Sequence, residues 1–196
     1  MDQRQLETTL AVTQAMASEL TDYLMGDNLY RQLIVKTPSG TKQPKMTLGA
    51  LLENVQALRS AESQLTAAQR AALAGIEDKV ALDRRAFAGQ WQALLRRELR
   101  SLLDSWKWYL DDVGRDPAAR ENYASEAHLR TRVEVVMAEL AGDSSLGGER
   151  QQLGALDSRL REMLRSGAYV GPRGEETRFP ADRFWWLYGR PPSGNG

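Results

Sequence analysis

The chain has 196 residues, of which 42% are hydrophobic and 27% are charged, as in an ordinary globular protein. Its 26 basic and 26 acidic side chains give a formal net charge of zero, so no overall field attracts nucleic acid or anionic lipid. The absence of cysteine excludes disulfides, thiol catalysis and cysteine-ligated zinc or iron–sulfur sites, and it favours a cytoplasmic protein.

The first part of the chain is predicted to hold two helices with an irregular segment between them. Apolar residues at spacings of three and four predict the first helix over about residues 2–25. Residues 26–46 contain Pro38-Ser39-Gly40 and fit either an irregular loop or a small β-hairpin, with the loop slightly favoured. Thr47 is the expected cap of the second helix, which extends to about Ser60.

One very long amphipathic helix is predicted over roughly residues 66–113, with Thr66 as its cap. Its apolar positions from Leu73 to Val113 repeat at about 3.64 residues per turn, closer to a straight α-helix than to the roughly 3.5 of a coiled coil. Such a helix would be about 72 Å long and is expected to be the central helix of the fold. A glycine costs about 1 kcal/mol relative to alanine inside a helix, so Gly75 and Gly89 are the weak points of this helix, and Gly75 is the first place where it could break.

Two further helices complete the predicted bundle. Asp116 and Pro117 begin a fourth helix, whose apolar stripe ends at Leu140. A flexible connection at 142–148 precedes a fifth helix at about 149–166. The pattern therefore predicts an all-α bundle of about five helices around one long central helix.

The C-terminal segment is rich in aromatic residues, with four in five positions: Phe184, Trp185, Trp186 and Tyr188. Burial of four rings would contribute about 15 kcal/mol before ordering entropy, so we expect one or two helical turns docked on the bundle. If the rings were exposed instead, they would form a partner surface or the lid of a ligand pocket. A single helical domain is predicted over residues 1–190, with residues 191–196 disordered.

Two surfaces of the long helix are candidate binding sites. Trp106, Trp108 and Tyr109 extend the aromatic surface, and the two tryptophans point about 200° apart, so they cannot share one core. Basic residues form a second face that suits an acidic partner or nucleic-acid phosphates: Arg96, Arg97, Arg100 and Lys107. Acidic residues nearby favour solvation or intramolecular pairing of these cations over either partner.

No catalytic, metal-binding or cofactor-binding set is identified. The one histidine, His128, has no carboxylate at helical spacing. The nucleophile motifs Gly-x-Ser-x-Gly and Ser-x-x-Lys are absent, and Ser39-Gly40-Thr41-Lys42 lacks parts of a phosphate loop. Asp111-Asp112 near a helix C-terminus predicts a salt bridge, for which Arg115 is a candidate, and Asp157 is placed to pair with Arg161.

The stretch from Thr47 to Val55 resembles the opening of the second helix in DinB-like four-helix bundles. Those proteins usually carry a metal-binding histidine along that helix, where Asn54 stands in this chain. The other metal histidines of that family have no counterpart here, which puts its metal site in doubt.

These patterns favour a non-catalytic helical scaffold or protein-interaction module. Self-association is expected, because a helix of about 72 Å is hard to cover with shorter helices. One alternative is a small-molecule-binding bundle or enzyme with a pocket near the aromatic C-terminal segment. Another is weak nucleic-acid binding through the arginine face. The N-terminus does not read as a signal peptide, and no apolar run approaches the length of a membrane span.

Overall fold

The computed structural model describes residues 1–192, apart from the side chain of Pro117. Within them the chain forms eight α-helices, two 3-10 helices and six short strands, which confirms the predicted helical class. Of the predicted disordered tail, residues 193–196 lie outside the described residues, whereas Pro191 and Pro192 are placed.

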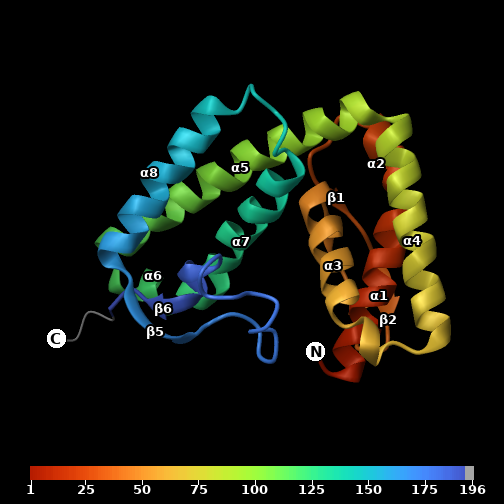
Figure 1. Cartoon of the computed structure of the whole chain (residues 1–196), viewed down its shortest axis with the longest axis horizontal. Coiled ribbons are helices and arrows are strands. Elements are labelled where there is room, and N and C mark those ends of the chain that lie inside the picture. Colours follow the sequence, from red (N-terminus) through yellow and green to blue (C-terminus); the bar gives the residue numbers. More distant parts are fainter. Residues whose placement is uncertain (193–196) are drawn as a thin grey trace. The chain divides into compact units, whose positions relative to one another are not determined.

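The chain divides into two compact units, Met1–Glu98 (unit 1) and Leu99–Gly196 (unit 2). Helix α5 (Ala88–Arg115) is the longest helix among the described residues, and it contributes to both units. Each unit has its own set of helices and a hairpin or ribbon of short strands (Figure 1).

Unit 1 contains four helices before α5: α1 (Gln3–Ser18), α2 (Leu20–Met25), α3 (Leu48–Ser60) and α4 (Ala67–Ala86). The helix predicted over 2–25 is therefore divided, at Glu19. Helices α1, α3 and α4 lie side by side (Figure 1). Their facing apolar residues form one core: Leu6, Leu10, Ala17, Leu58, Ala61, Leu65, Leu73 and Ile76.

The N-terminus of α3 is held by a buried carboxylate as well as by its predicted cap. The Thr47 hydroxyl accepts from the backbone N–H of Ala50 at 3.1 Å, as a capping residue does. The same hydroxyl donates to Glu98 Oε1 at 2.5 Å, and the Gly49 backbone N–H donates to Glu98 Oε2 at 2.8 Å. Glu98 is 1% exposed, so α5 places its negative charge inside unit 1, at the positive end of a helix.

Residues 26–46 form the hairpin, the second of the two predicted alternatives. Strands β2 (Val35–Thr37) and β3 (Gly40–Lys42) pair around a turn in which Gly40 has a φ of 97°. Strands β1 (Arg31–Gln32) and β4 (Lys45–Met46) continue the pairing. Proline at position 44 has no N–H to donate, so the regular ladder is interrupted there and the Pro44 carbonyl accepts from Leu33 at 3.0 Å.

The long helix predicted over 66–113 is two helices, with the break at Phe87 and not at Gly75. Phe87 has φ −121° and ψ 38°, outside the helical range, and it separates α4 from α5. Gly75 stays helical because Leu73 and Ile76 are buried beside it. Burial of each such side chain contributes about 1.5–3 kcal/mol, which exceeds the roughly 1 kcal/mol cost of the glycine.

Unit 2 continues from α5 with α6 (Pro117–Glu121), α7 (Tyr123–Glu139), α8 (Gly147–Met163), strand β5 (Arg165–Tyr169), a 3-10 turn (Trp185–Leu187) and strand β6 (Tyr188–Arg190). Ion pairs link α8 to both neighbouring helices: Arg100 to Glu149, Arg159 to Asp111, and Arg130 to Asp157. Asp111 and Asp157 thus pair with other arginines than the predicted Arg115 and Arg161.

Candidate functional site: an arginine-lined cleft

The aromatic C-terminal segment is docked in the core of unit 2, as predicted, but as a 3-10 turn followed by a strand. Phe184 and Trp186 are buried, whereas Trp185 and Tyr188 are half-buried. The Trp186 ring meets Phe184 edge-on at 5.4 Å between centroids. The segment therefore contributes mainly to the core of unit 2 and presents little free aromatic surface.

Trp186 anchors this segment to α7. Its indole N–H donates to the Thr131 hydroxyl at 3.1 Å, and its carbonyl accepts from the Tyr123 hydroxyl at 2.6 Å. The Arg130 guanidinium lies 3.9 Å from the centre of the Trp186 ring and forms two hydrogen bonds, of 2.8 and 2.9 Å, with Asp157. Arg161 stacks on Trp185 at 3.6 Å, which explains why it is not the partner of Asp157.

The aromatic residues of α5 divide between core and surface. Trp106 is fully buried and stacks with the buried ring of Tyr109 at 5.5 Å between centroids, and the Tyr109 ring lies 6.5 Å from that of Tyr123. Trp108 is 71% exposed. The structure thus places Trp106 and Tyr109 inside unit 2 and leaves only Trp108 on its surface.

The predicted arginine face is divided between the two units. In unit 1, Arg97 donates to the carbonyl of Asp27 at 3.0 Å, and Arg96 contacts the side chain of Gln92 at 3.4 Å. In unit 2, Arg100 bonds Glu149 at 2.8 Å and holds the pKa of that carboxyl below its usual range, while Lys107 is exposed. Intramolecular contacts therefore engage the arginines of this face.

A different set of arginines surrounds the ribbon formed by β5 and β6. The antiparallel register places Arg165 opposite Arg190 and Ser166 opposite Gly189. Gly189 has a φ of 151°, and a Cβ there would lie 2.2 Å from the Arg165 carbonyl oxygen, so only glycine allows the strands to approach this closely. The ribbon thus holds two positive side chains at one level of the ladder.

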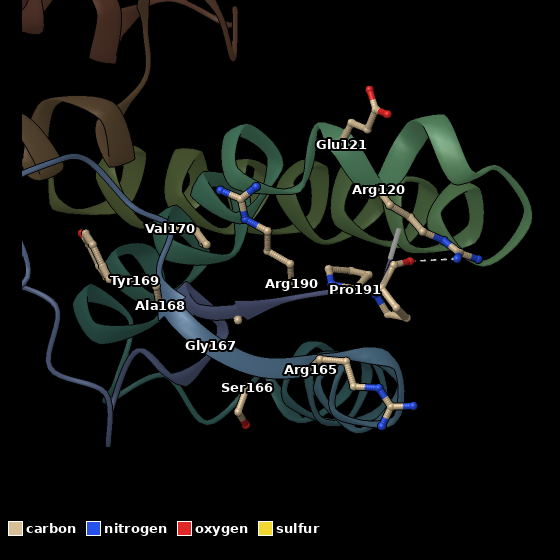
Figure 2. Close-up of a pocket in the computed structure, with 12 residues that line it drawn as sticks. Arg120, Glu121, Arg165, Ser166, Gly167, Ala168, Tyr169, Val170, Arg190 and Pro191 are labelled. Atoms are coloured by element: carbon tan, nitrogen blue, oxygen red, sulfur yellow. Dashed lines mark hydrogen bonds between the residues drawn. The ribbon is translucent and has the colours of Figure 1, made fainter. Parts of the chain in front are cut away.

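The ribbon and α6 border an open cleft of about 560 Å³ (Figure 2), which we call the arginine cleft. It lies wholly within unit 2. The residues that line it come from α6, from β5 and the residue after it, and from β6 and the two prolines after it. They are Arg120, Glu121, Arg165, Ser166, Gly167, Ala168, Tyr169, Val170, Gly189, Arg190, Pro191 and Pro192. A volume of this size lies in the range of pockets that bind small molecules.

The charge of the arginine cleft is positive, since three arginines and one glutamate line it. Arg120 is fixed by donating to the carbonyls of Val113 at 3.1 Å and Pro192 at 2.9 Å. Arg165 and Arg190 are exposed, and within residues 1–192 neither guanidinium has a hydrogen bond or an ion pair. Figure 2 shows these two guanidinium groups turned away from each other. Both keep their donors available for an anion.

A second hollow, of about 420 Å³, adjoins the arginine cleft at Val170, which lines both. Its walls are mainly apolar, with Phe179 and Leu187 buried beside it. His128 and Ser125 add polar groups at its edge. We call this space the apolar hollow, and it is where the structure places the single histidine.

Comparisons with known proteins assign no relative. No family model matches the chain, no curated protein matches it, and no solved structure matches it. The DinB-like resemblance therefore gains no support, and the Asn54 side-chain amide lies 3.8 Å from the sulfur of Met16.

Within residues 1–192, no group of three or more histidine, acidic or cysteine side chains is arranged to hold a metal ion. No helix in that range combines the length and the apolar character needed to cross a bilayer.

Proposed function

We propose that the chain is a non-catalytic binding protein whose unit 2 recognises an anionic group in the arginine cleft. The observation that carries this proposal is the placement of Arg165 opposite Arg190 in the β5–β6 ladder. Like charges directly opposite each other destabilise an antiparallel pair, and neither residue has a partner within residues 1–192 that offsets this. An anion bound beside either guanidinium group would supply a negative charge that reduces this repulsion.

The contacts of three other arginines in unit 2 support the assignment. Arg130 and Arg159 each bond an aspartate, and Arg100 bonds a glutamate, so their charges are used within the fold. Arg165 and Arg190 instead project from a ribbon beside an open cleft. Their geometry suits recognition of a carboxylate, sulfonate or phosphate, which accept paired N–H bonds from a guanidinium.

The proposal is tested by titrating the full chain with inorganic pyrophosphate in an isothermal calorimeter at low and high salt. We expect saturable binding that weakens as salt increases, and a loss of at least ten-fold in affinity for Arg165→Gln and Arg190→Gln. Arg173→Gln is the matched control, because it removes an exposed arginine of the same unit that does not line the cleft. Equal affinities for all three variants would refute the proposal.

A second binding function is supported by Trp108, whose ring is 71% exposed on α5. Tryptophan is the residue type most enriched at the energetic centres of protein interfaces. We propose that this ring takes part in self-association of the chain. Sedimentation should then show an oligomer that Trp108→Ser weakens and Leu82→Ser, which removes another exposed apolar side chain, does not. A monomer at high concentration would rule this function out.

A further inference from the structure

The arginine cleft and the apolar hollow adjoin each other, and we call the two together the groove. Val170 belongs to the lining of both. On one side, the segment 165–170 lines the arginine cleft, and its continuation to Pro172 lines the apolar hollow. This segment is continuous in sequence, so one stretch of chain borders both spaces.

The opposite wall is also continuous. Glu121 lines the arginine cleft, and Ala124, Ser125 and His128 line the apolar hollow, at spacings that place all four on one helical face. Helix α6 ends at Glu121, but Asn122 has φ −83° and ψ 0°, and its carbonyl accepts from the N–H of Glu126 at 3.1 Å. The helical row therefore continues from one hollow into the other.

The two ends of the groove differ in chemistry. Arg165 and Arg190 make one end cationic, whereas the other end is bounded by the buried rings and chains of Phe179 and Leu187. The Thr131 hydroxyl, which also lines the apolar end, already accepts from Trp186 and donates to the carbonyl of Ala127. That end therefore offers mainly apolar contact to a ligand.

We propose that the groove binds an amphipathic organic anion, with its charged group at the arginine end and an aromatic ring or short alkyl chain in the apolar hollow. This inference rests on the proposed function, because the arginine cleft supplies the site for the anionic group. It adds the class of ligand: a small organic acid or ester in which one charged group is joined to an apolar body.

The test uses three probes on the full chain: naphthalene-2-sulfonate, which has both parts, methanesulfonate, which has the anion alone, and 2-naphthol, which has the ring alone. We expect naphthalene-2-sulfonate to bind at least ten-fold more tightly than either part in calorimetric titrations. In amide NMR spectra of the wild-type chain, it should shift the signals of residues 124–128 and 170–172, whereas methanesulfonate should shift only those around the arginine cleft.

Variants separate the two ends. Ser125→Trp fills the mouth of the apolar hollow, so it should remove the advantage of naphthalene-2-sulfonate and leave methanesulfonate binding unchanged. Ser158→Trp is the matched control, since Ser158 is also exposed on a helix of unit 2 but lies outside the groove. Arg190→Gln should weaken both anions, and circular dichroism checks that each variant is folded.

The outcomes distinguish the inference from the proposed function. If the two sulfonates bind equally, and no signals of residues 124–128 shift, the amphipathic ligand is refuted while anion binding stands. If Arg190→Gln changes the affinity of neither sulfonate, the arginine cleft does not bind anions, and both proposals fall.

Discussion

Replacing Trp186 with alanine tests whether the aromatic segment stabilises unit 2. The Trp186 side chain is 1% exposed. Burial of about 200 Å² at about 25 cal/mol per Å² contributes about 5 kcal/mol, which a compact unfolded chain reduces to about 4 kcal/mol. The substitution also removes the hydrogen bond to Thr131 and the contact with Arg130. We therefore expect Trp186→Ala to lower the free energy of unfolding by about 4 kcal/mol, within the usual range for core tryptophan.

The readout is amide hydrogen exchange of α7, on which Trp186 docks. Because the chain has two compact units, exchange in one helix reports unit 2 more directly than a single melting curve does. A loss of about 4 kcal/mol should raise about a thousand-fold the rate of those amide exchange events that require unfolding. Trp108→Ala is the control: its ring is 71% exposed, so exchange should change by less than about three-fold. Similar exchange in both variants would contradict this account of the docked segment.

Three further predictions concern other contacts. Gly189→Ala should lower the melting temperature, because its Cβ would lie 2.2 Å from a backbone oxygen at a φ of 151°, whereas Gly167→Ala, with 3.8 Å of clearance, should not. Glu98→Gln should lower the free energy of unfolding by about 2 kcal/mol, because the glutamine amide cannot accept both the Thr47 and the Gly49 hydrogen bonds. Urea titration measures this change, and an unchanged unfolding midpoint would contradict the expectation. Arg159 lowers the pKa of Asp111, so this pair stabilises the fold above the ordinary carboxyl pKa and loses its effect as pH falls below about 4. Arg159→Gln should therefore be less stable than wild type at pH 7, with the difference shrinking at pH 2.5, and a constant difference would argue against the ion pair.

The helices of unit 1 could be predicted because their stability comes from a local apolar pattern. Leu73 and Ile76 recur at helical spacing and are buried in the core of unit 1. The position of the break could not be predicted from propensity, which indicated Gly75. The actual break at Phe87 coincides with a tertiary contact, since Asp83 in the last turn of α4 accepts from Thr21 at 3.0 Å and from Lys79 at 2.5 Å.

The docking of the aromatic segment could be predicted from composition, but the role of each ring could not. Apolar area alone indicated that the tail would fold back. The sequence pattern does not distinguish Trp185 from its neighbour Trp186, and only the latter meets Thr131 on α7 and is fully buried. The half-buried ring is covered instead by Arg161 from α8. The environment of each ring depends on which faces of α7 and α8 the C-terminal segment packs against, and the sequence pattern does not specify those faces.

The arginine cleft cannot be predicted from the sequence because its geometry comes from strand pairing between distant residues. The segment Arg165–Tyr169 has no alternation of apolar and polar residues, and four of its five positions are exposed. The sequence pattern therefore predicts its first two residues as the end of the preceding helix. Its partner Tyr188–Arg190 was predicted as a helical turn and tail. The one available signal was Gly189, whose positive φ is what a close strand approach requires.

The pairing register of β5 and β6 also supports an anion-binding role for the arginine cleft. Like charges at facing positions of a ladder are destabilising, and a site that breaks such a local rule is where function is expected. Unit 2 pairs its buried arginine, Arg130, with two carboxylates, so the fold has the means to neutralise a guanidinium. It leaves Arg165 and Arg190 beside a cleft of about 560 Å³ without such a partner in residues 1–192. A ligand that supplies the missing negative charge would stabilise the ribbon, so a bound anion should raise the melting temperature of the wild-type chain more than that of Arg190→Gln.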